Sequence, residues 1–337
     1  MTRLLLAATV FGFGAIASAA SAETVTVYSY RQPDLIAPLL QAFTAASGYE
    51  VEALYLKKGM IERVQAEGDN APVDVYLTTD ISRLVALKNA GITRAVNFDA
   101  VNNNIPAPYR DGEGHWYGLT QRGRIFYVAN DLENPPTRYE DLADPQYAGM
   151  ICHRDGQHPY NNALFASLIA NLGAEATRTW MQGLKANQAR TPTGNDRAQA
   201  KGIYEGECQI GIGNTYYVGL MLTNEEEPEQ KDWAAAINLI LPNSDDRGTH
   251  MNISGMAMAA NSPNPAGAQA LMEFLASDPA QEMYSEIVFE YPVSPRAAIS
   301  DIVASFGTLT PATLSLTEIA AGSAAASEMV DAVGLNQ

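Results

Sequence analysis

The stretch Val25-Thr26-Val27-Tyr28-Ser29-Tyr30, followed by apolar residues at helical spacing over 35–46, decides the fold class. Apolar side chains at every second position are typical of a strand, and a spacing of three to four is typical of a helix. The same unit repeats, with predicted strands over 50–55 and 73–77 and predicted helices over 59–67 and 81–90. Strands that alternate with helices indicate an α/β fold, with a mainly parallel sheet and helices on both faces.

The later part of the chain predicts a second lobe and a return to the first. Residues 116–120 and 123–129 have the pattern of extended segments, and a second series of strands and helices runs from Tyr139 to about Pro242. The segment His250 to Met258 then returns as a strand. Two crossover segments between lobes make a hinge. Ligands of such sheets bind beyond the carboxyl ends of the strands, so we expect the site in the cleft between the lobes.

The first 22 residues have the pattern of a signal peptide. Arg3 precedes an apolar stretch over 4–16, and Ala20-Ser21-Ala22 supplies a small-residue cleavage site. The apolar stretch is shorter than the ~20 residues that a membrane span requires. We therefore predict an exported, soluble periplasmic protein that is cleaved near Ala22.

Composition excludes one class of partner. The formal net charge is −17, and it becomes −18 without residues 1–22, because that segment contains Arg3 and no acid. A chain this acidic is not expected to bind nucleic acid. We interpret the acidity as a solubility feature, and attraction of cations stays open as an alternative.

The two cysteines predict a disulfide. Cys152 and Cys208 each lie in a short strand-like run, and an even number of cysteines in an oxidising compartment is typical of a bridge. Two buried thiols are the alternative.

An adjacent pair of tyrosines, Tyr216 and Tyr217, lies in Gly-Ile-Gly-Asn-Thr-Tyr-Tyr-Val-Gly over 211–219, where a predicted strand turns into a helix. Phenolates are hard oxygen ligands, which favour hard cations, and tyrosine has a precedent as an iron ligand. The alternative is that both rings are core or rim aromatics.

The chain resembles the periplasmic binding proteins for ferric iron, which are solute receptors of ABC importers, over essentially all residues after 22. The motifs that carry the resemblance are Val27-Tyr28-Ser29-Tyr30-Arg31-Gln32-Pro33, Asp74-Val75-Tyr76-Leu77-Thr78-Thr79-Asp80, Tyr117-Gly118-Leu119-Thr120-Gln121-Arg122, His158-Pro159-Tyr160-Asn161, Asn214-Thr215-Tyr216-Tyr217 and Glu290-Tyr291-Pro292-Val293. Asn-Thr-Tyr-Tyr is the most specific of them. The resemblance implies a two-lobed fold of the type II class with a two-crossover hinge. It places one lobe at 23–123 plus 244–295 and the other at 124–243 plus 296–337.

The family's metal ligands map onto Tyr160, Tyr216 and Tyr217. Other members carry a histidine, sometimes followed by a tyrosine, where this chain has Gln32 and Pro33. That departure favours the branch in which three tyrosines bind Fe³⁺ together with a carbonate-like anion.

Charge arithmetic agrees with this branch, because three phenolates neutralise Fe³⁺ and the anion then needs positive donors. We expect Arg31, Gln32 and Arg122 to supply them, since a guanidinium matches a planar oxyanion. An ordinary ion pair is the alternative role for each arginine. Arg124 is a weaker candidate.

The resemblance implies a function of capture and delivery. We expect a monomeric receptor, not an enzyme, that binds ferric iron between its lobes and passes it to an inner-membrane ABC permease. A receptor for a polyamine, thiamine or a phosphonate is the alternative solute class. A secreted enzyme is disfavoured, because no nucleophile elbow, His-Glu-x-x-His motif or phosphate loop is present. The four histidines lack zinc-site spacing, and His158 is a second-shell candidate beside Tyr160.

Overall fold

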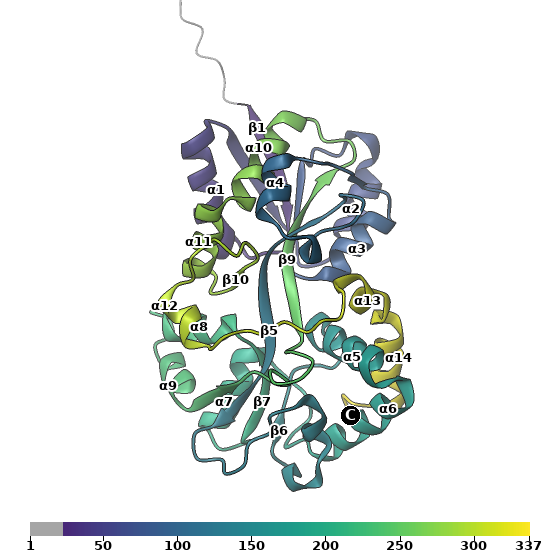
Figure 1. The fold of residues 1–337 in the computed structure, drawn as a ribbon, viewed down its shortest axis with the longest axis vertical. Coiled ribbons are helices and arrows are strands. Elements are labelled where there is room, and N and C mark those ends of the chain that lie inside the picture. The colour runs from purple at the N-terminus through teal and green to yellow at the C-terminus, as the bar shows by residue number, and fades with distance from the viewer. Residues whose placement is uncertain (1–22) are drawn as a thin grey trace, which may run out of the picture.

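The computed structural model describes residues 23–337, so the predicted signal peptide at 1–22 lies outside the described residues. The described chain forms two lobes that are stacked along the long axis and joined by two long strands, β5 (Tyr117–Ala129) and β9 (Met251–Ala259) (Figure 1). We call the lobe built on β1, β2 and β3 the N-lobe, and the lobe built on β6, β7 and β8 the C-lobe.

The N-lobe follows the predicted alternation. Its strands are β1 (Thr24–Ser29), β2 (Glu50–Tyr55), β3 (Val75–Thr78) and the short β4 (Thr93–Arg94), and its helices are α1 (Pro33–Ser47), α2 (Met60–Glu67), α3 (Ile81–Asn89), α4 (Asp99–Asn104), α10 (Pro265–Ala276) and α11 (Asp278–Ile287). Val25 and Val27 of β1 are fully buried, and so is Leu39 of α1. The alternating and helical apolar patterns in the sequence are therefore the patterns that form this core.

The C-lobe carries the second series of elements. Its strands are β6 (Ile151–Cys152), β7 (Ile210–Asn214) and β8 (Ile237–Ile240), and its helices are α5 (Pro159–Leu172), α6 (Ala174–Ala186), α7 (Asp196–Tyr204), α8 (Tyr216–Leu222) and α9 (Gln230–Ala235). Short 3₁₀ turns lie at Gly68–Asn70, Ala107–Tyr109, Tyr139–Ala143 and Pro145–Tyr147. None of the helices in residues 23–337 is long and apolar enough to cross a membrane.

Strand β5 is one continuous strand where the sequence suggested two extended segments. Its first part pairs with β9, with Gln121 opposite Ile253, and its second part pairs with β7 and β8. A register shift between Gly118 and Thr120 marks a bulge in the part that pairs with β9. The predicted hinge of two crossover strands is thus formed by β5 and β9.

The sheets are mixed, which refines the expectation of mainly parallel sheets. The pairs β1–β2, β1–β3 and β6–β7 are parallel, as the repeated strand-helix units predict. The ladders of β5 and β9 are antiparallel, because one strand leaves the N-lobe and the other returns to it. The residue pattern of a single strand does not show whether that strand pairs parallel or antiparallel with its neighbours.

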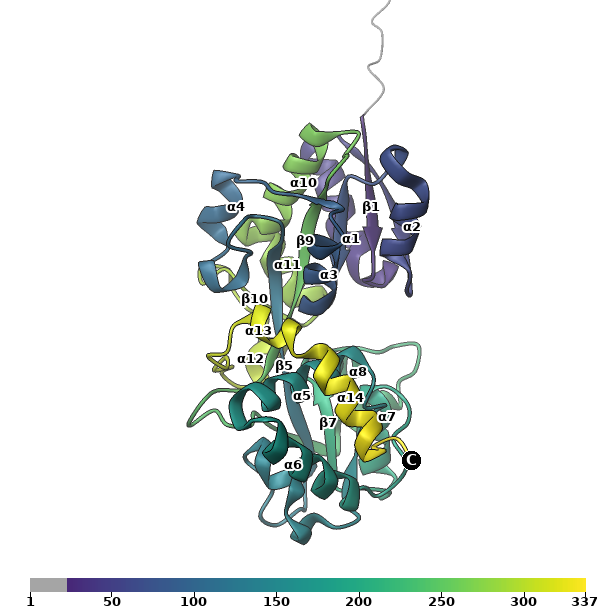
Figure 2. The ribbon, with the colours of Figure 1, turned by 90° about the vertical axis from the view of Figure 1, so that its right-hand side faces the viewer.

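The chain passes between the lobes a third time after β10 (Tyr291–Pro292), which pairs with β5. Helix α12 (Asp301–Ser305) contacts both α11 and α8. The last helices, α13 (Leu316–Ala321) and α14 (Ser323–Val333), pack against α5 of the C-lobe, and α13 also contacts α3 of the N-lobe (Figure 2).

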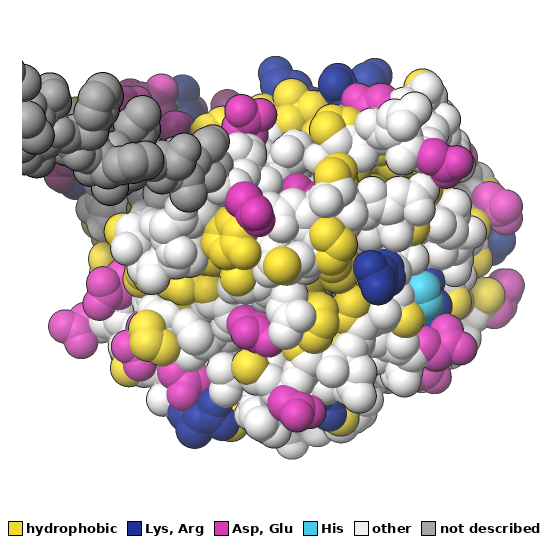
Figure 3. Space-filling view, turned by 90° about the horizontal axis from the view of Figure 1, so that it is seen from above, with side chains coloured by type: hydrophobic (Ala, Val, Ile, Leu, Met, Phe, Trp, Pro, Cys, Tyr) yellow, Lys and Arg dark blue, Asp and Glu magenta, His cyan; other side chains and the backbone are white. Residues whose placement is uncertain are grey.

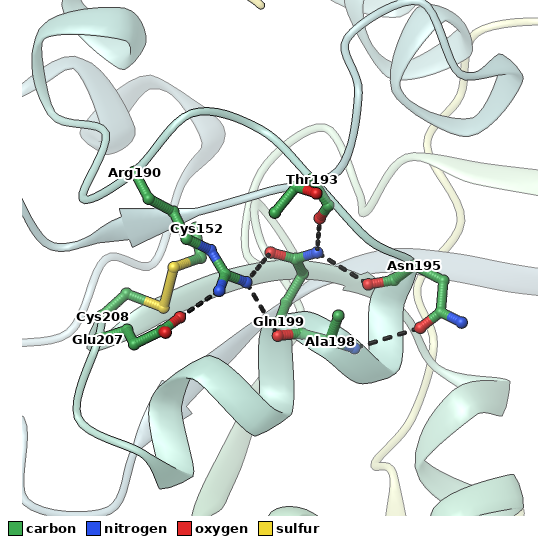
Figure 4. Close-up of a disulfide and its surroundings, with 8 residues drawn as sticks. All are labelled: Cys152, Arg190, Thr193, Asn195, Ala198, Gln199, Glu207 and Cys208. Carbon is green, nitrogen blue, oxygen red and sulfur yellow. Dashed lines mark hydrogen bonds and ion pairs between the residues drawn. A yellow bond between two sulfur atoms is a disulfide. The ribbon is translucent and has the colours of Figure 1, made fainter.

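The predicted disulfide between Cys152 and Cys208 is present, with the two Cα atoms 5.9 Å apart. It joins β6 to the segment that leads into β7. Figure 4 shows Gln199 of α7 beside it, with its side-chain nitrogen donating at 2.8 Å to the carbonyl oxygens of both Thr193 and Asn195. On the end of the molecule seen in Figure 3, charged side chains of both signs surround scattered hydrophobic ones.

Candidate metal and anion site

Three tyrosines from two C-lobe helices meet at one point. Strand β7 ends at Asn214, and the chain turns directly into α8, which begins with Tyr216 and Tyr217. Their rings stack with centroids 4.3 Å apart. Tyr160 lies in the first turn of α5, and its hydroxyl oxygen is 3.5 Å from that of Tyr216. The structure therefore brings together the three phenols that the sequence singled out.

These phenols border a cavity of about 300 Å³ between the lobes. The N-lobe contributes Arg31 and Gln32, the two expected anion donors from the loop after β1, to the lining of this cavity. The five basic side chains that line the cavity are Arg31, Lys57, Arg83, Arg154 and Arg197. Among the described residues, no aspartate or glutamate lines it. The cavity is thus rich in positive charge although the whole chain is strongly acidic.

A larger cavity of about 530 Å³ lies in the N-lobe beside Asp111 and Glu113. Both carboxylates are paired with Lys88, at 2.9 Å and 2.7 Å. Because Lys88 already neutralises part of the charge of these carboxylates, this cavity offers less chemistry than the one between the lobes.

The phenols of Tyr216 and Tyr217 hold their protons in the absence of a cation. Burial raises the pKa of Tyr216 well above its ordinary value, and the neighbouring phenols of Tyr160 and Tyr217 raise it further. Burial raises the pKa of Tyr217 to about 12, again with a contribution from Tyr160. A ligand that uses these oxygens as anions at neutral pH must itself displace the protons, as a multivalent metal ion does.

Arg31 lies between the cavity and a buried carboxylate. Its Nη2 donates to both oxygens of Glu290, at 2.9 Å and 3.0 Å, and also to Ser254 Oγ. Burial disfavours its charge, but Glu290 and the phenols of Tyr216 and Tyr160 raise the pKa of Arg31. The arginine is therefore a fixed cation at the cavity wall.

Arg122 is placed differently from our expectation. It is not among the residues that line the cavity, because its guanidinium lies behind the ring of Tyr160, 5.0 Å from the ring centroid. Its Nη2 donates to the carbonyl oxygen of Thr79, and its Nη1 donates to Ser254 Oγ at 3.3 Å. Direct contact between Arg122 and an anion stays a prediction, while Gln32 does reach the cavity.

Arg154 is a cavity residue that the sequence reasoning missed. Its guanidinium lies 5.4 Å from the centroid of the Tyr160 ring and pairs with Asp196 at 3.1 Å. It follows β6 at the carboxyl end of that strand, where ligands of parallel strands bind, and this position was the signal that could have identified it.

Asp196 organises the base of the site. This fully buried carboxylate accepts from Arg124 Nη1 at 2.7 Å and from the backbone N–H of Asn214 at 2.9 Å. It thereby fixes the turn that presents the tyrosine pair. Arg124, the weaker anion candidate, is held here by Asp196 and by Asn161 rather than exposed to the cavity.

His158 lies against Tyr160, as the second-shell interpretation expects. Its Nδ1 accepts from the backbone N–H of Tyr160 at 3.2 Å, and the two rings meet edge to face with centroids 4.6 Å apart. Burial, reinforced by Arg154, lowers the pKa of His158 to about 3, so the imidazole is neutral at neutral pH.

No cluster of three or more histidine, cysteine, aspartate or glutamate residues suited to a metal ion occurs in residues 23–337. The oxygen donors that line the cavity between the lobes include the phenols of Tyr160, Tyr216 and Tyr217.

Comparison with known proteins agrees with this fold. The family described as bacterial extracellular solute-binding protein matches residues 70–304. The chain is 36% identical to iron uptake protein A1 of Synechocystis sp., over 93% of this chain and 87% of that protein. It is similar to the apo ferric ion-binding protein A of Pasteurella haemolytica, with a TM-score of 0.88 and 43% identity over 94% of this chain and 99% of that one. It is also similar to a Trichodesmium protein in complex with iron and citrate ligands, with a TM-score of 0.87 and 35% identity over 92% and 99% of the two chains.

Proposed function

The chain belongs to the family of bacterial extracellular solute-binding proteins, and on that basis we propose that it captures ferric iron in the periplasm for an ABC importer. In this proposal Tyr160, Tyr216 and Tyr217 bind the metal, and an inner-membrane permease receives it. The observation that carries the proposal is the meeting of three phenol oxygens at a cavity between the lobes. The printed names of the relatives, which are iron uptake and ferric ion-binding proteins, support the choice of metal.

Charge balance supports an anion that binds with the metal. Three phenolates neutralise Fe³⁺. Two buried arginine pairs surround the site, each compensated by one carboxylate: Glu290 lies between Arg31 and Arg122, and Asp196 lies between Arg124 and Arg154. Each group keeps one positive charge in excess, and Lys57, Arg83 and Arg197 add further positive charge to the cavity wall, so a negatively charged ligand is favoured beside the metal.

We propose carbonate as this anion, held by Arg31 and Gln32 at the cavity wall and by Arg122 from behind Tyr160. A planar oxyanion that supplies two oxygens fills positions that three phenolates leave open on the metal. The cavity of about 300 Å³ also has room for a larger carboxylate. A carboxylate ligand is found with iron in the Trichodesmium relative, so citrate is the natural competitor to test.

The lining of the cavity disfavours the alternative cationic solutes. A polyamine or thiamine carries positive charge and needs acidic partners, whereas the cavity presents five basic side chains and, among the described residues, no carboxylate. Ferric iron is also positively charged, but in this proposal the three phenolates and the bound anion supply the negative charge that the cavity lining lacks.

The proposal is tested by loading the metal-free protein with ferric iron in buffers that contain bicarbonate, citrate or neither, followed by desalting. We expect about one iron per chain, a visible phenolate-to-metal absorption band, and much weaker retention when both anions are absent. A colourless protein without bound iron in all three buffers would overturn the proposed function. Equal retention in all three would overturn only the role of the anion.

A further inference from the structure

Glu290 is a fully buried carboxylate that the metal chemistry does not use. It accepts hydrogen bonds from Ser254 Oγ of β9, at 2.8 Å, and from Thr120 Oγ1 of β5. It also accepts two bonds from Arg31, which comes from the loop after β1. One carboxylate thus ties together both hinge strands and the first loop of the cavity.

The charge of Glu290 depends on the same arginines that we assign to the anion. Burial opposes its ionisation, but Arg31 and Arg122 lower the pKa of the carboxyl below its ordinary value. Arg31 donates to Glu290 and Ser254 through Nη2 alone, and the residue lines the cavity. Its guanidinium is therefore positioned to serve the carboxylate on one side and a cavity ligand on the other.

The backbone next to Glu290 is unusual. Phe289 has a φ of 59°, in the left-handed region that a bulky side chain rarely adopts. Such strain persists only when the surrounding structure enforces it. Val288 is buried in the N-lobe core, whereas Phe289 is buried with Tyr216 in the C-lobe core. Two successive side chains are therefore buried in the cores of different lobes.

The ring of Phe289 also reaches the helix that carries the tyrosine pair. A Cβ at Gly219 of α8 would collide with this ring, so glycine at that position permits the close approach. The bulge in β5 lies directly before Thr120, which is a partner of Glu290. The strained backbone of Phe289, the bulge in β5 and the buried carboxylate of Glu290 therefore lie close together in the hinge.

We propose that Glu290 is a positioning residue that couples anion binding to the hinge. It holds Arg31 and Arg122 against β5 and β9 when the cavity lacks an anion, and it shares these arginines with the anion when the cavity fills. The inference rests on the proposed function, because it takes the anion to be the partner of ferric iron. It assigns a specific role to a residue outside the metal and anion contacts.

The coupling predicts the direction in which a substitution of Glu290 changes the stabilisation of the protein by an anion. Glu290→Gln keeps the shape and a hydrogen-bond acceptor but removes the carboxylate that pairs with the buried Arg31 and Arg122. The variant without ligand should be less stable than the wild type, and an anion should replace the missing charge. Added anion should therefore stabilise this variant more than it stabilises the wild type.

The matched control is Asp74→Asn. Asp74 is also a buried carboxylate, and it accepts from the backbone N–H groups of Thr26 and Asn264 and from Ser262 Oγ, in the N-lobe. Asp74 is not among the residues that line the cavity. Its loss should lower stability without changing the response to an anion.

The experiment measures thermal unfolding of the full-length mature protein without iron, over titrations of sodium bicarbonate and sodium citrate. We expect Glu290→Gln to bind the effective anion roughly tenfold more tightly than the wild type, with a larger rise in Tm, and Asp74→Asn to match the wild-type rise. Equal rises in all three proteins, or a smaller rise in Glu290→Gln, would overturn the coupling.

Glu290→Asp keeps the inference testable if Glu290→Gln does not fold. It retains the charge but shortens the reach to Arg31, so an enlarged anion response is again expected, and a wild-type response would contradict the coupling. Iron loading of the wild type separates this result from the proposed function. Iron binding with unchanged anion responses overturns the coupling alone, and an enlarged anion response without iron binding overturns the proposed metal alone.

Discussion

The phenol of Tyr217 is placed next to a buried cation. The guanidinium of Arg154 lies beside Tyr217 and Tyr160. Burial opposes its charge, but Asp196 and then the phenols of Tyr217 and Tyr160 raise the pKa of Arg154. Arg154 in turn favours the ionised form of Tyr217 and so works against the rise that burial causes in the pKa of this phenol. Arg154 should therefore help the metal to displace the phenolic protons.

Arg154→Gln should weaken ferric iron binding. A hydrogen bond to a charged group contributes about 1.5 to 3 kcal/mol, which corresponds to a roughly tenfold to hundredfold weaker affinity. The measurement is a competition titration against a chelator at constant pH and constant anion concentration. Arg197→Gln is the control, because Arg197 also lines the cavity, with its guanidinium 5.8 Å from the centroid of the Tyr217 ring, but donates to Gln230 instead of pairing with Asp196. Equal losses in both variants would mean that only the overall charge of the cavity matters.

Two buried histidines make the stability of the fold depend on pH. Burial lowers the pKa of His153 to about 4 and that of His250 to about 3, from an ordinary value of 6.5. Both are neutral in the folded protein, whereas the unfolded chain binds protons below about pH 6.5. Their contribution to stability is therefore complete above that pH and is lost as the pH falls toward about 4.

The expected result is a decrease in the free energy of unfolding between about pH 6.5 and pH 4.5, with each histidine contributing up to ~1.4 kcal/mol per pH unit. Urea unfolding of the metal-free protein at several pH values measures it. In His250→Gln, the free energy of unfolding should change less steeply with pH, because the unfolded variant binds one proton fewer over this range. A free energy of unfolding that stays constant over this range would show that the histidines are not buried as described.

Residue-scale prediction from the sequence succeeded where a local motif carried the signal. Tyr216 and Tyr217 are adjacent in the chain and follow a predicted strand, so their shared position could be inferred from spacing. Arg154 was missed because selecting it among 21 lysines and arginines requires knowing which strand ends face the cavity. Arg122 shows the same limit: its place behind Tyr160 depends on the packing of side chains from both lobes.

At the scale of elements, the disulfide fixes the strands that precede the site. Cys152 and Cys208 are separated by 56 residues, and the strands that they join continue toward Arg154 and the tyrosine pair. Closing a loop of this length in the unfolded chain stabilises a protein by about 2 to 4 kcal/mol.

The double variant Cys152→Ser with Cys208→Ser should therefore lose about 2 to 4 kcal/mol of stability, as measured by urea unfolding of the metal-free protein. Both side chains are buried away from the cavity, so ferric iron should still bind with the wild-type absorption band. The wild type under a reductant serves as a second comparison. A changed band in the folded variant would mean that the bridge also orients the phenols.

Elements with a clear periodicity were predicted within a few residues, including β2 at 50–55 and α3 at 81–90. The continuity of β5 was not, because Gln121 and Arg122 interrupt its apolar pattern at the point where the strand crosses between lobes. These polar residues belong to the hinge, where Gln121 pairs opposite Tyr291 of β10 and Arg122 reaches toward Glu290. Polar residues within an otherwise apolar, buried strand were therefore the sequence signal that indicated the hinge.

At the scale of the whole molecule, the distribution of charge is uneven. An acidic chain surrounds a cavity that is lined by basic and phenolic side chains from both lobes. The contributions divide by lobe: the C-lobe supplies the three phenols, and the N-lobe supplies Arg31 and Gln32. Metal bound to the C-lobe phenols and an anion bound to the N-lobe groups would draw the two lobes together across the hinge.

The central claim is that three phenolates in one lobe bind ferric iron. It is tested most directly by titrating ferric iron into the wild type and into Tyr160→Phe, Tyr216→Phe and Tyr217→Phe while following the visible phenolate band. Tyr55→Phe is the matched control, because Tyr55 also lines the cavity but comes from the N-lobe strand β2. We predict that each of the three variants loses or shifts the band and binds iron at least roughly tenfold more weakly, with Tyr55→Phe unchanged. Wild-type bands and affinities in all three variants would contradict the account.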